Sequence, residues 1–288
     1  LVVAVTDAPP ANLTYTLPVA TYTKGIAAQA NLPSSDGGAV ELYSVLPPLP
    51  DGLSLNPSTG AIAGTPSTAA AVAYYTVTAA NSGGSAVATL KLAVSSLTMV
   101  SAGSNHTCAV VDGAAWCWGR NEYGQLGNNS RINSSVPVSV SGLSSGVQAI
   151  AAGLSHTCAI VNGAAKCWGD NSSFQLGYGS QPAPVLVPIQ VSGLTSDVQA
   201  IAAGFQHTCA IAGGAAKCWG SNLQGRLGSG TTAAAPLPTP VVGLGGGVEA
   251  IAAGGSHSCA IVSGGTHCWG ANFAGQLGNG SASDSLVP

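Results

Sequence analysis

The stretch that decides the fold is His106-Thr-Cys-Ala-Val-Val-Asp-Gly-Ala-Ala-Trp-Cys-Trp-Gly119. Near-copies of it begin at His156, His207 and His257, so that the copies follow one another after 50, 51 and 50 residues. Self-similarity at a fixed period of about 20 to 50 residues is typical of repeat architectures. The second part of the chain is therefore predicted to be an array of one structural unit.

Each copy has a pair of turn-forming residues at its centre, flanked by short apolar or small residues. The four pairs are Asp112-Gly113, Asn162-Gly163, Gly213-Gly214 and Ser263-Gly264. Such pairs favour a two-residue type I′ turn, so the copies predict β-hairpins. With the first pair as the loop, Cys108 faces Cys117 at a non-hydrogen-bonded position, where Cα atoms lie about 4.5 Å apart. This separation lies at the short end of the range that a disulfide spans, about 4.4–6.8 Å.

The same register holds in all four copies and uses all eight cysteines. We therefore expect four disulfides, namely Cys108–Cys117, Cys158–Cys167, Cys209–Cys218 and Cys259–Cys268. Free thiols are one alternative, and a zinc site made from sets such as His106, Cys108 and Cys117 is another. Each hairpin offers only three such ligands, and neighbouring hairpins would lie too far away to supply a fourth. We expect no metal and no other cofactor, and the paired cysteines indicate an oxidising, extracellular compartment.

The composition favours an all-β protein. Only 6% of the 288 residues are charged and 40 are glycines, whereas globular domains average about 25% charged residues. Seven Lys and Arg residues and a net charge of −3 leave no basic stripe for nucleic acid. No apolar run reaches the about 20 residues of a membrane-spanning helix, so membrane insertion is not expected.

Common enzyme motifs are missing from the sequence. There is no phosphate-cradling Gly-x-x-x-x-Gly-Lys and no His-Glu-x-x-His, and the ten acidic residues are scattered rather than paired. We therefore expect a protein without catalytic residues.

Each period divides into four short strands, as the second copy illustrates. The expected strands are 147–153, 156–161 and 164–168, with a fourth in a long arm around 188–191. Four short strands in about 50 residues is the spacing of a β-propeller blade.

The repeats resemble those of the regulator of chromosome condensation family, whose units carry Ala-x-Gly-x-x-His, Trp-Gly, Gly-Gln-Leu-Gly and a later Pro. These elements occur here at Gly103 and His106, at Trp118-Gly119 and at Gly124-Gln-Leu-Gly127, and again in the later copies. Two arm positions depart from the pattern, with Phe174 in place of Gly and Arg226 in place of Gln. The resemblance covers 99–288 and implies a β-propeller.

About four blades are expected in this chain. Family members close a ring of seven blades, whereas the sequence holds three full periods and a fourth that stops at Pro288. The resemblance thus implies a partial propeller with two alternatives. Either the natural chain continues beyond Pro288, or the units form an open fan whose exposed face is covered by another copy.

Two residue types recur at one position in every repeat. They are the histidines His106, His156, His207 and His257 and the tryptophans Trp118, Trp168, Trp219 and Trp269. One residue per repeat usually has a structural task, so the histidines are expected to bond backbone groups in a turn through both ring nitrogens. The tryptophans alternate with the cysteines and therefore lie on the opposite face. Packing between blades is their expected use, and stacking on sugars is a second one.

The first part of the chain contains no cysteine and no copy of the repeat. Residues 1–97 are therefore expected to form one domain and residues 98–288 the repeat domain. Segments 74–79 and 89–94 have strand character and predict the last hairpin of a β-sandwich.

Segment 49–66 contains Leu-Pro-x-Gly-Leu-x-Leu followed by Thr-Gly-x-Ile-x-Gly-Thr-Pro. This pattern resembles an Ig-like domain family that occurs in tandem on bacterial surface and secreted proteins, and it implies a spacer or adhesive module without catalytic residues. Segment 1–6 is similar to 90–95. Residues 1–10 are therefore either the last strand of an upstream copy or the first strand of this domain.

Together these features predict a non-enzymatic extracellular or cell-surface protein, secreted and bacterial, that serves adhesion or fibre assembly. The expected partners are a surface protein, a polysaccharide or other copies of the chain. The first alternative is a secreted protein inhibitor, by analogy with a bacterial β-lactamase inhibitor of this propeller family, and a carbohydrate-binding surface module is a further one. Nucleotide exchange on a small GTPase, the eukaryotic activity of the family, is opposed by the paired cysteines.

Overall fold

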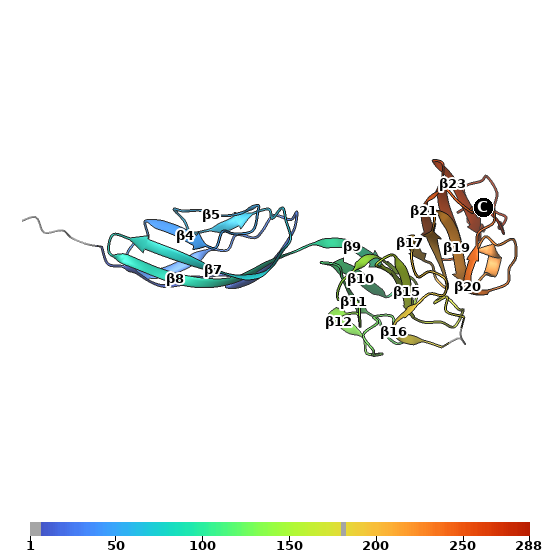
Figure 1. Ribbon diagram of the computed structural model, residues 1–288, viewed down its shortest axis with the longest axis horizontal. Coiled ribbons are helices and arrows are strands. Elements are labelled where there is room, and N and C mark those ends of the chain that lie inside the picture. Colours follow the sequence, from blue (N-terminus) through green and yellow to red (C-terminus); the bar gives the residue numbers. More distant parts are fainter. Residues whose placement is uncertain (1–6, 180–182) are drawn as a thin grey trace, which may run out of the picture. The chain divides into compact units, whose positions relative to one another are not determined.

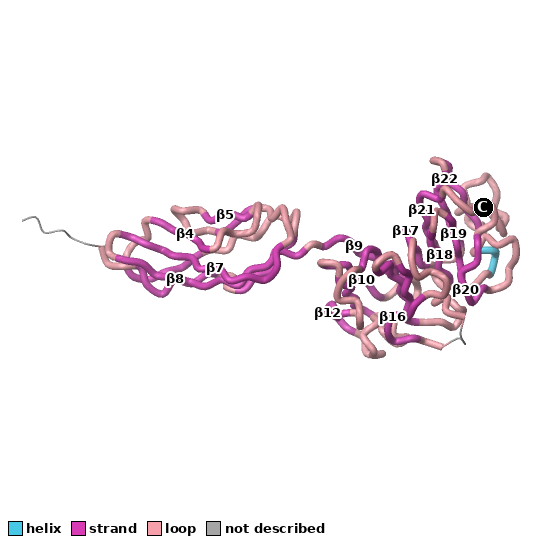
Figure 2. Tube along the Cα trace, in the orientation of Figure 1, coloured by secondary structure: helices cyan, strands magenta, loops and turns pink. Residues whose placement is uncertain are grey.

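The computed structural model describes residues 7–179 and 183–288. The chain splits into two compact units, one up to Leu97 and one from Thr98 to Pro288. Both units are built of β-strands, and the one helical element among the described residues is a 3-10 turn, η1 (Leu223–Gly225), drawn in cyan in Figure 2. The fold class is therefore all-β, as predicted. The expectation for Leu1 to Thr6 lies outside the described residues.

The first unit is an Ig-like β-sandwich. Its strands are β1 (Pro10–Tyr15), β2 (Val19–Thr23), β3 (Pro33–Gly37), β4 (Leu42–Leu46), β5 (Leu53–Leu55), β6 (Ile62–Gly64), β7 (Ala70–Asn81) and β8 (Gly84–Ser95). They form a four-stranded sheet in the order β2-β8-β7-β4 and the two pairs β1-β3 and β5-β6. Ile62 from the small pair and Val77 from the large sheet are both fully buried in a shared core, so the layers pack face to face.

The two hairpins expected in this unit are present, β5-β6 around the turn after Leu55 and β7-β8. Between the strands, the side chain of Asn31 is fully buried. Its Oδ1 accepts from the Leu17 amide at 2.8 Å, and its Nδ2 donates to the Leu17 carbonyl at 2.7 Å. One amide side chain thus satisfies both backbone groups of a residue that precedes β2.

The second unit is a fan of four blades (Figure 1). Blade one holds β9 (Leu97–Ala102), β10 (His106–Val111), β11 (Ala114–Gly119) and β12 (Ser134–Ser139). Blade two holds β13 (Val147–Ala152), β14 (His156–Val161), β15 (Ala164–Gly169) and β16 (Val185–Gln190). Blade three holds β17 (Val198–Ala203), β18 (His207–Ala212), β19 (Ala215–Gly220) and β20 (Ala235–Pro240). Blade four holds β21 (Val248–Ala253), β22 (His257–Val262) and β23 (Gly265–Gly270), with a further bridge between Gly270 and Ser285.

The central hairpin of each blade forms around the expected turn. In blade one, Asp112 and Gly113 have φ of 52° and 74°, and in blade four Ser263 and Gly264 have φ of 51° and 74°. Positive φ at both positions defines the type I′ turn, which fits the twist of the two strands. Because this turn has two residues, the register follows, and Cys108 pairs with Cys117.

Candidate functional site

Four disulfides join the two strands of the central hairpins. They are Cys108–Cys117, Cys158–Cys167, Cys209–Cys218 and Cys259–Cys268, with Cα–Cα distances of 4.0 to 4.1 Å. These are the pairs expected from the hairpin register, at a separation somewhat shorter than expected. All eight sulfurs are bonded to one another, so none is a thiolate that could bind zinc.

The two faces of a blade have different chemistry. We call the face that carries the disulfide the tail face and the face that carries the tryptophan the head face. At the first interface, Cys108, Val110 and Leu126 of blade one share a buried cluster with Ile150 and Trp168 of blade two. The clusters between blades two and three and between blades three and four have the same make-up. The tail face of each blade thus packs on the head face of the next.

Hydrogen bonds cross the same interface. The Nε2 of His106 lies 2.8 Å from the Oγ1 of Thr157 in the next blade. This hydroxyl donates to the backbone carbonyl of Gln125 at 2.8 Å, and the Nε1 of Trp168 donates to the same carbonyl at 2.9 Å. We call the segment between the third and fourth strands of a blade its arm, which in blade one lies between β11 and β12. One carbonyl in the arm of blade one therefore accepts two hydrogen bonds from blade two.

The pattern repeats at the other two interfaces. His156 contacts Thr208 at 3.0 Å, and Thr208 and Trp219 donate to the Gln175 carbonyl at 2.8 and 2.9 Å. His207 contacts Ser258 at 2.9 Å, and Ser258 and Trp269 donate to the Arg226 carbonyl at 3.0 and 2.9 Å. The acceptor is a backbone carbonyl each time, which explains why Arg can replace Gln at position 226.

These bonds define the histidine tautomer. A hydroxyl carries one proton, and Thr157 donates that proton to Gln125, so its oxygen accepts from the Nε2–H of His106. The Nδ1 atom is then unprotonated, and in His106, His156 and His207 it is buried without a partner. The expected bonding of both ring nitrogens to turn backbone is therefore wrong for these three. One nitrogen bonds a side chain of the next repeat, and the other bonds nothing.

Burial keeps these imidazoles neutral. It is the largest cause that lowers the pKa of His106 to about 4 and the pKa values of His156 and His207 to about 3. A positive charge on His106 would further disfavour protonation of His156, and Arg226 acts on His207 in the same way. Histidines that are neutral, buried and occupied in an interface are structural residues.

The tryptophans lie on the face opposite the disulfides, and three of them are fully buried: Trp168, Trp219 and Trp269. Stacking on a sugar is impossible at these three positions without separating the blades. Trp118 is only partly buried, because it stands on the head face of blade one, where no blade of the described chain precedes it.

The residue two positions before each tryptophan differs between the repeats. Here Trp116 is 37% exposed, Lys166 and Lys217 are partly exposed and His267 is exposed.

The sequence analysis did not identify two recurrent residues. One is the hydroxyl after each histidine, as in Thr157, Thr208 and Ser258, which carries the interface bond. The other is an asparagine in Trp-Gly-x-Asn, found at Asn121, Asn171, Asn222 and Asn272. In blade one, Asn121 Oδ1 accepts from the Leu126 amide at 2.9 Å and Nδ2 donates to the carbonyls of Ser130 and Ile132. Recurrence at the repeat period was the available signal for both.

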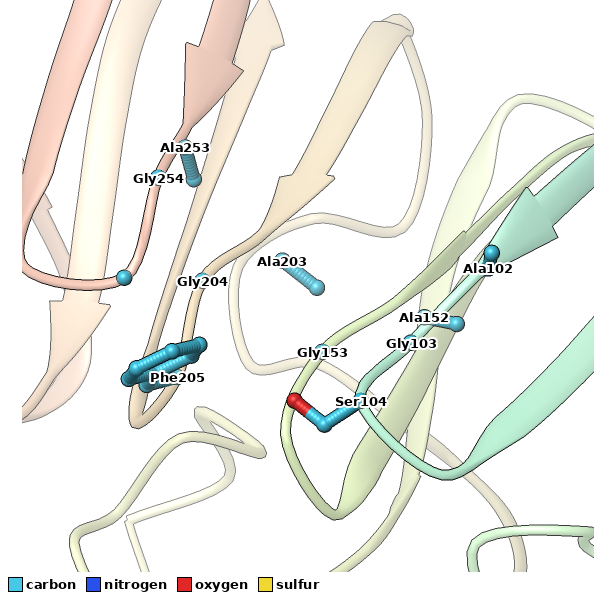
Figure 3. Close-up of a pocket in the computed structure, with 11 residues that line it drawn as sticks. Ala102, Gly103, Ser104, Ala152, Gly153, Ala203, Gly204, Phe205, Ala253 and Gly254 are labelled. Carbon is cyan, nitrogen blue, oxygen red and sulfur yellow. The ribbon is translucent and has the colours of Figure 1, made fainter.

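The inner corners of the four blades line a shallow groove of about 290 Å³, shown in Figure 3. Its lining comes from residues 102–104, 152–153, 203–205 and 253–255. A Cβ on Gly103 would lie 2.4 Å from the Gly153 carbonyl oxygen and 2.7 Å from Cε1 of His106, so the corner requires glycine. The ring of Phe205 is 49% exposed and is the largest side chain in the groove.

Comparison with protein families supports this architecture. The model described as Regulator of chromosome condensation (RCC1) repeat matches residues 112–160, 162–211 and 218–261, and a second RCC1 repeat model matches 98–125. The family described as Putative Ig domain matches residues 4–95. The protein is thus of the repeat class in which β-sheet blades stack around an axis. The chain belongs to the RCC1 repeat family and carries an Ig domain before its repeats.

Among solved structures, human WBSCR16 matches with a TM-score of 0.60 at 19% identity, over 96% of this chain and 82% of that chain. This likeness supports the fold. The ectodomain of the Physcomitrella patens receptor kinase CR4 matches with a TM-score of 0.37 at 17% identity, over 92% of this chain and 73% of that one. The search of curated proteins gives no match.

Removing an interior disulfide should cost more stability than removing the last one. The two variants to compare are Cys158→Ala/Cys167→Ala and Cys259→Ala/Cys268→Ala. The disulfides that they remove have the same sequence separation of 9, so each variant loses a loop-closure contribution of roughly 2–3 kcal/mol. Only the first pair is fully buried, so its loss also leaves a cavity worth on the order of 1 kcal/mol. Denaturant unfolding measures both, and equal losses would contradict a packing role for the interior pair.

Acid should destabilise the repeat unit. The pKa values of His106, His156 and His207 lie below the ordinary value of 6.5 in the folded state. Their contribution is therefore complete above about pH 6.5 and is lost as pH falls toward 4, because only the unfolded chain takes up protons. The slope of the unfolding free energy against pH gives the number of protons that the chain takes up on unfolding. In His156→Gln this number should be smaller by about one. An unaltered pH dependence of the unfolding free energy in His156→Gln would refute the burial argument.

Proposed function

We propose that this chain is a non-enzymatic extracellular protein of a bacterium, secreted or held at the cell surface, where the disulfide-bonded repeat unit binds a partner and the Ig-like unit acts as a spacer. The expected role is adhesion or the building of an extracellular assembly. RCC1 repeats and an Ig domain fit a binding or structural protein. The extracellular location and the role in adhesion or assembly are what we propose beyond this.

The observation that carries the proposal is one disulfide in every blade, with three of the four fully buried. Disulfides persist in oxidising compartments and are rare where thioredoxin and glutathione keep thiols reduced. The blades need such bonds, because many of their buried apolar residues are Ala, Val and Cys. A reducing compartment would remove roughly 2–3 kcal/mol for each bond.

The geometry also supports a role without catalysis. The recurrent histidines, the residue type most often used in acid–base chemistry, are neutral and buried at blade interfaces. One stretch, Gly142-Leu-Ser-Ser-Gly146, fits the Gly-x-Ser-x-Gly pattern of hydrolases. It lies in the loop between β12 and β13, whereas that motif requires a strand-to-helix turn. Within the described ranges, no group of three His, Cys, Asp or Glu side chains could hold a metal ion.

We propose that the groove at the inner corners receives the partner, either a surface protein or a polysaccharide. All four blades contribute to it, and Phe205 offers an exposed aromatic ring to an apolar side chain or a sugar face. The shallow groove with small residues suits an extended chain better than a compact ligand. The secreted inhibitor remains a prediction that rests on fold analogy, and the carbohydrate-binding module remains a prediction that rests on the stacking of exposed aromatic rings on sugars. No helix of the described chain has the length and apolarity to cross a membrane.

Location and thiol state test the compartment. In producing cells, the chain should be found in the medium or on the surface, and alkylation without prior reduction should modify none of its eight cysteines. Reduction followed by alkylation should then modify all eight and serves as the control. Cytoplasmic chain with free thiols would overturn the extracellular proposal.

Phe205→Ala tests the groove. Retention of the purified chain on immobilised cell-surface protein and on cell-surface polysaccharide should fall on the order of tenfold in this variant, the loss expected for one aromatic contact. Phe273→Ala is the matched control, since that ring is 79% exposed and does not line the groove. Equal retention of both variants on every surface would rule out the groove as the binding face.

A further inference from the structure

Each arm has two positions whose side chains lie next to each other, and blade two shows how such a pair interacts. The pair there is Asp170 and Gln175, and both residues are buried. Nε2 of Gln175 donates to Oδ2 of Asp170 at 2.8 Å, and the Ser172 hydroxyl donates to the same oxygen at 2.9 Å. The carboxylate of Asp170 is thus held by groups of its own arm.

Blade three has a charge of the opposite sign at these two positions. Arg226 stands where Gln175 stands, and Ser221 stands where Asp170 stands. The backbone runs in the same way in both arms. The amides of Ser221 and Asp170 each donate to a carbonyl in the loop between the first and second strands of their blade, at 2.8 and 2.9 Å. The arm of blade three therefore keeps a donor and lacks the carboxylate that accepts from it in blade two.

Arg226 is a buried cation without a carboxylate partner. The residue is 4% exposed, its Nε donates to the Leu223 carbonyl at 2.9 Å, and its Nη2 donates to the Gln224 side chain at 2.8 Å. Nη1 has no partner among the described residues. Burial lowers the pKa of the guanidinium, because its charge is taken out of water without compensation. In blade one, by contrast, the cation at a position of this pair is Arg120, and it pairs with Glu122.

The serine beside Arg226 also lacks a partner. Ser221 is 6% exposed, and its hydroxyl makes no hydrogen bond with any described residue. Neither this hydroxyl nor Nη1 of Arg226 is fully enclosed. Because the matching side chains of blade two touch each other, these two free donors lie at one place that solvent reaches. An anion is the ligand that would satisfy both.

We propose that Arg226 and Ser221 bind a carboxylate of an acidic polysaccharide, which takes the place that the Asp170 carboxylate has in blade two. Arginine binds carboxylates through paired, charge-assisted hydrogen bonds, and a serine hydroxyl supplies one further donor. The ligand carboxylate then compensates the buried charge of Arg226. The inference names the ligand class for the groove of the proposed function, and it rests on that function.

The neighbouring groove favours a sugar as the source of the carboxylate. The Ser221 amide is bonded to Gln206, which directly follows Phe205. A Cβ on Gly255 would lie 2.9 Å from Cε2 of Phe205, so the ring rests on the backbone of blade four, with about half of it exposed (Figure 3). A uronic acid offers a flat ring face and a carboxylate in one residue, whereas an acidic amino acid has no such face. No charged residue lines the groove, so Arg226 supplies the charge.

Calorimetric titration of the purified chain with polygalacturonate tests the inference, and the fully methyl-esterified polymer is the uncharged control ligand. The wild-type chain should bind the acid at least about tenfold more tightly than the ester, because only the acid forms charge-assisted hydrogen bonds. Arg226→Gln should weaken binding of the acid by a similar factor. Glutamine stands at this position in the other three repeats, so the fold is retained. Arg131→Gln removes an exposed cation from the arm of blade one, and this matched control should bind as wild type does.

Ser221→Asp gives a second, independent outcome. It places in blade three the carboxylate that blade two has in Asp170, so the new side chain should pair with Arg226 and occupy the site. Binding of polygalacturonate should fall at least about tenfold. The midpoint of thermal unfolding should rise above that of the wild-type chain, because the buried charge is then compensated within the arm.

Three results would overturn the inference. They are a wild-type chain that binds the acid no more tightly than the ester, an Arg226→Gln chain that binds the acid as wild type does, and binding of poly-glutamate as tight as that of polygalacturonate. The last result would assign the site to an acidic protein. If Phe205→Ala lowers retention on cell-surface polysaccharide while Arg226→Gln does not, the groove of the proposed function stands and this inference falls.

Discussion

The repeat unit depends on hydrogen bonds to the backbone carbonyl of one arm residue in each of blades one to three. At the first interface this is the carbonyl of Gln125, which accepts from the hydroxyl of Thr157 and from the indole of Trp168. The bond from Trp168 places the largest side chain of blade two against the disulfide face of blade one, and the bond from Thr157 orients His106. Because the acceptor belongs to the backbone, the arm side chain can vary while the interface stays the same, as Arg226 demonstrates.

The arm residues around that carbonyl differ from blade to blade. The arm position that is Gly124 in blade one is Phe174 in blade two, where it keeps a positive φ of 65° that only glycine adopts without strain. In blade three, Arg226 donates to the Leu223 carbonyl and to the Gln224 side chain, and the arm tightens into η1. These departures are local, because the carbonyl that the next blade requires remains in position.

The hairpins, the four disulfides and the all-β class followed from the sequence, since each depends on residues close together in the chain and on a turn with a known number of residues. The histidine partner did not follow. His106 bonds Thr157, about one repeat away. In a strictly periodic sequence, a residue and its counterpart in the next repeat look alike, so the sequence does not show which of the two His106 contacts. The groove was also missed, because the alanines and glycines that form it carry no chemical pattern, and only their convergence in space makes a surface.

The disulfides also have a mechanical consequence. Each one joins two strands of a single blade, and none joins one blade to another. A force applied along the chain therefore meets noncovalent contacts at every blade boundary, while the turn segment inside each bond cannot extend at all. Each closed segment withholds about eight residues, or roughly 26–29 Å of contour length. Stretching would release the fan as a series of blades with stiff centres, so the molecule would lengthen in limited steps, and no central hairpin would straighten while its disulfide is intact.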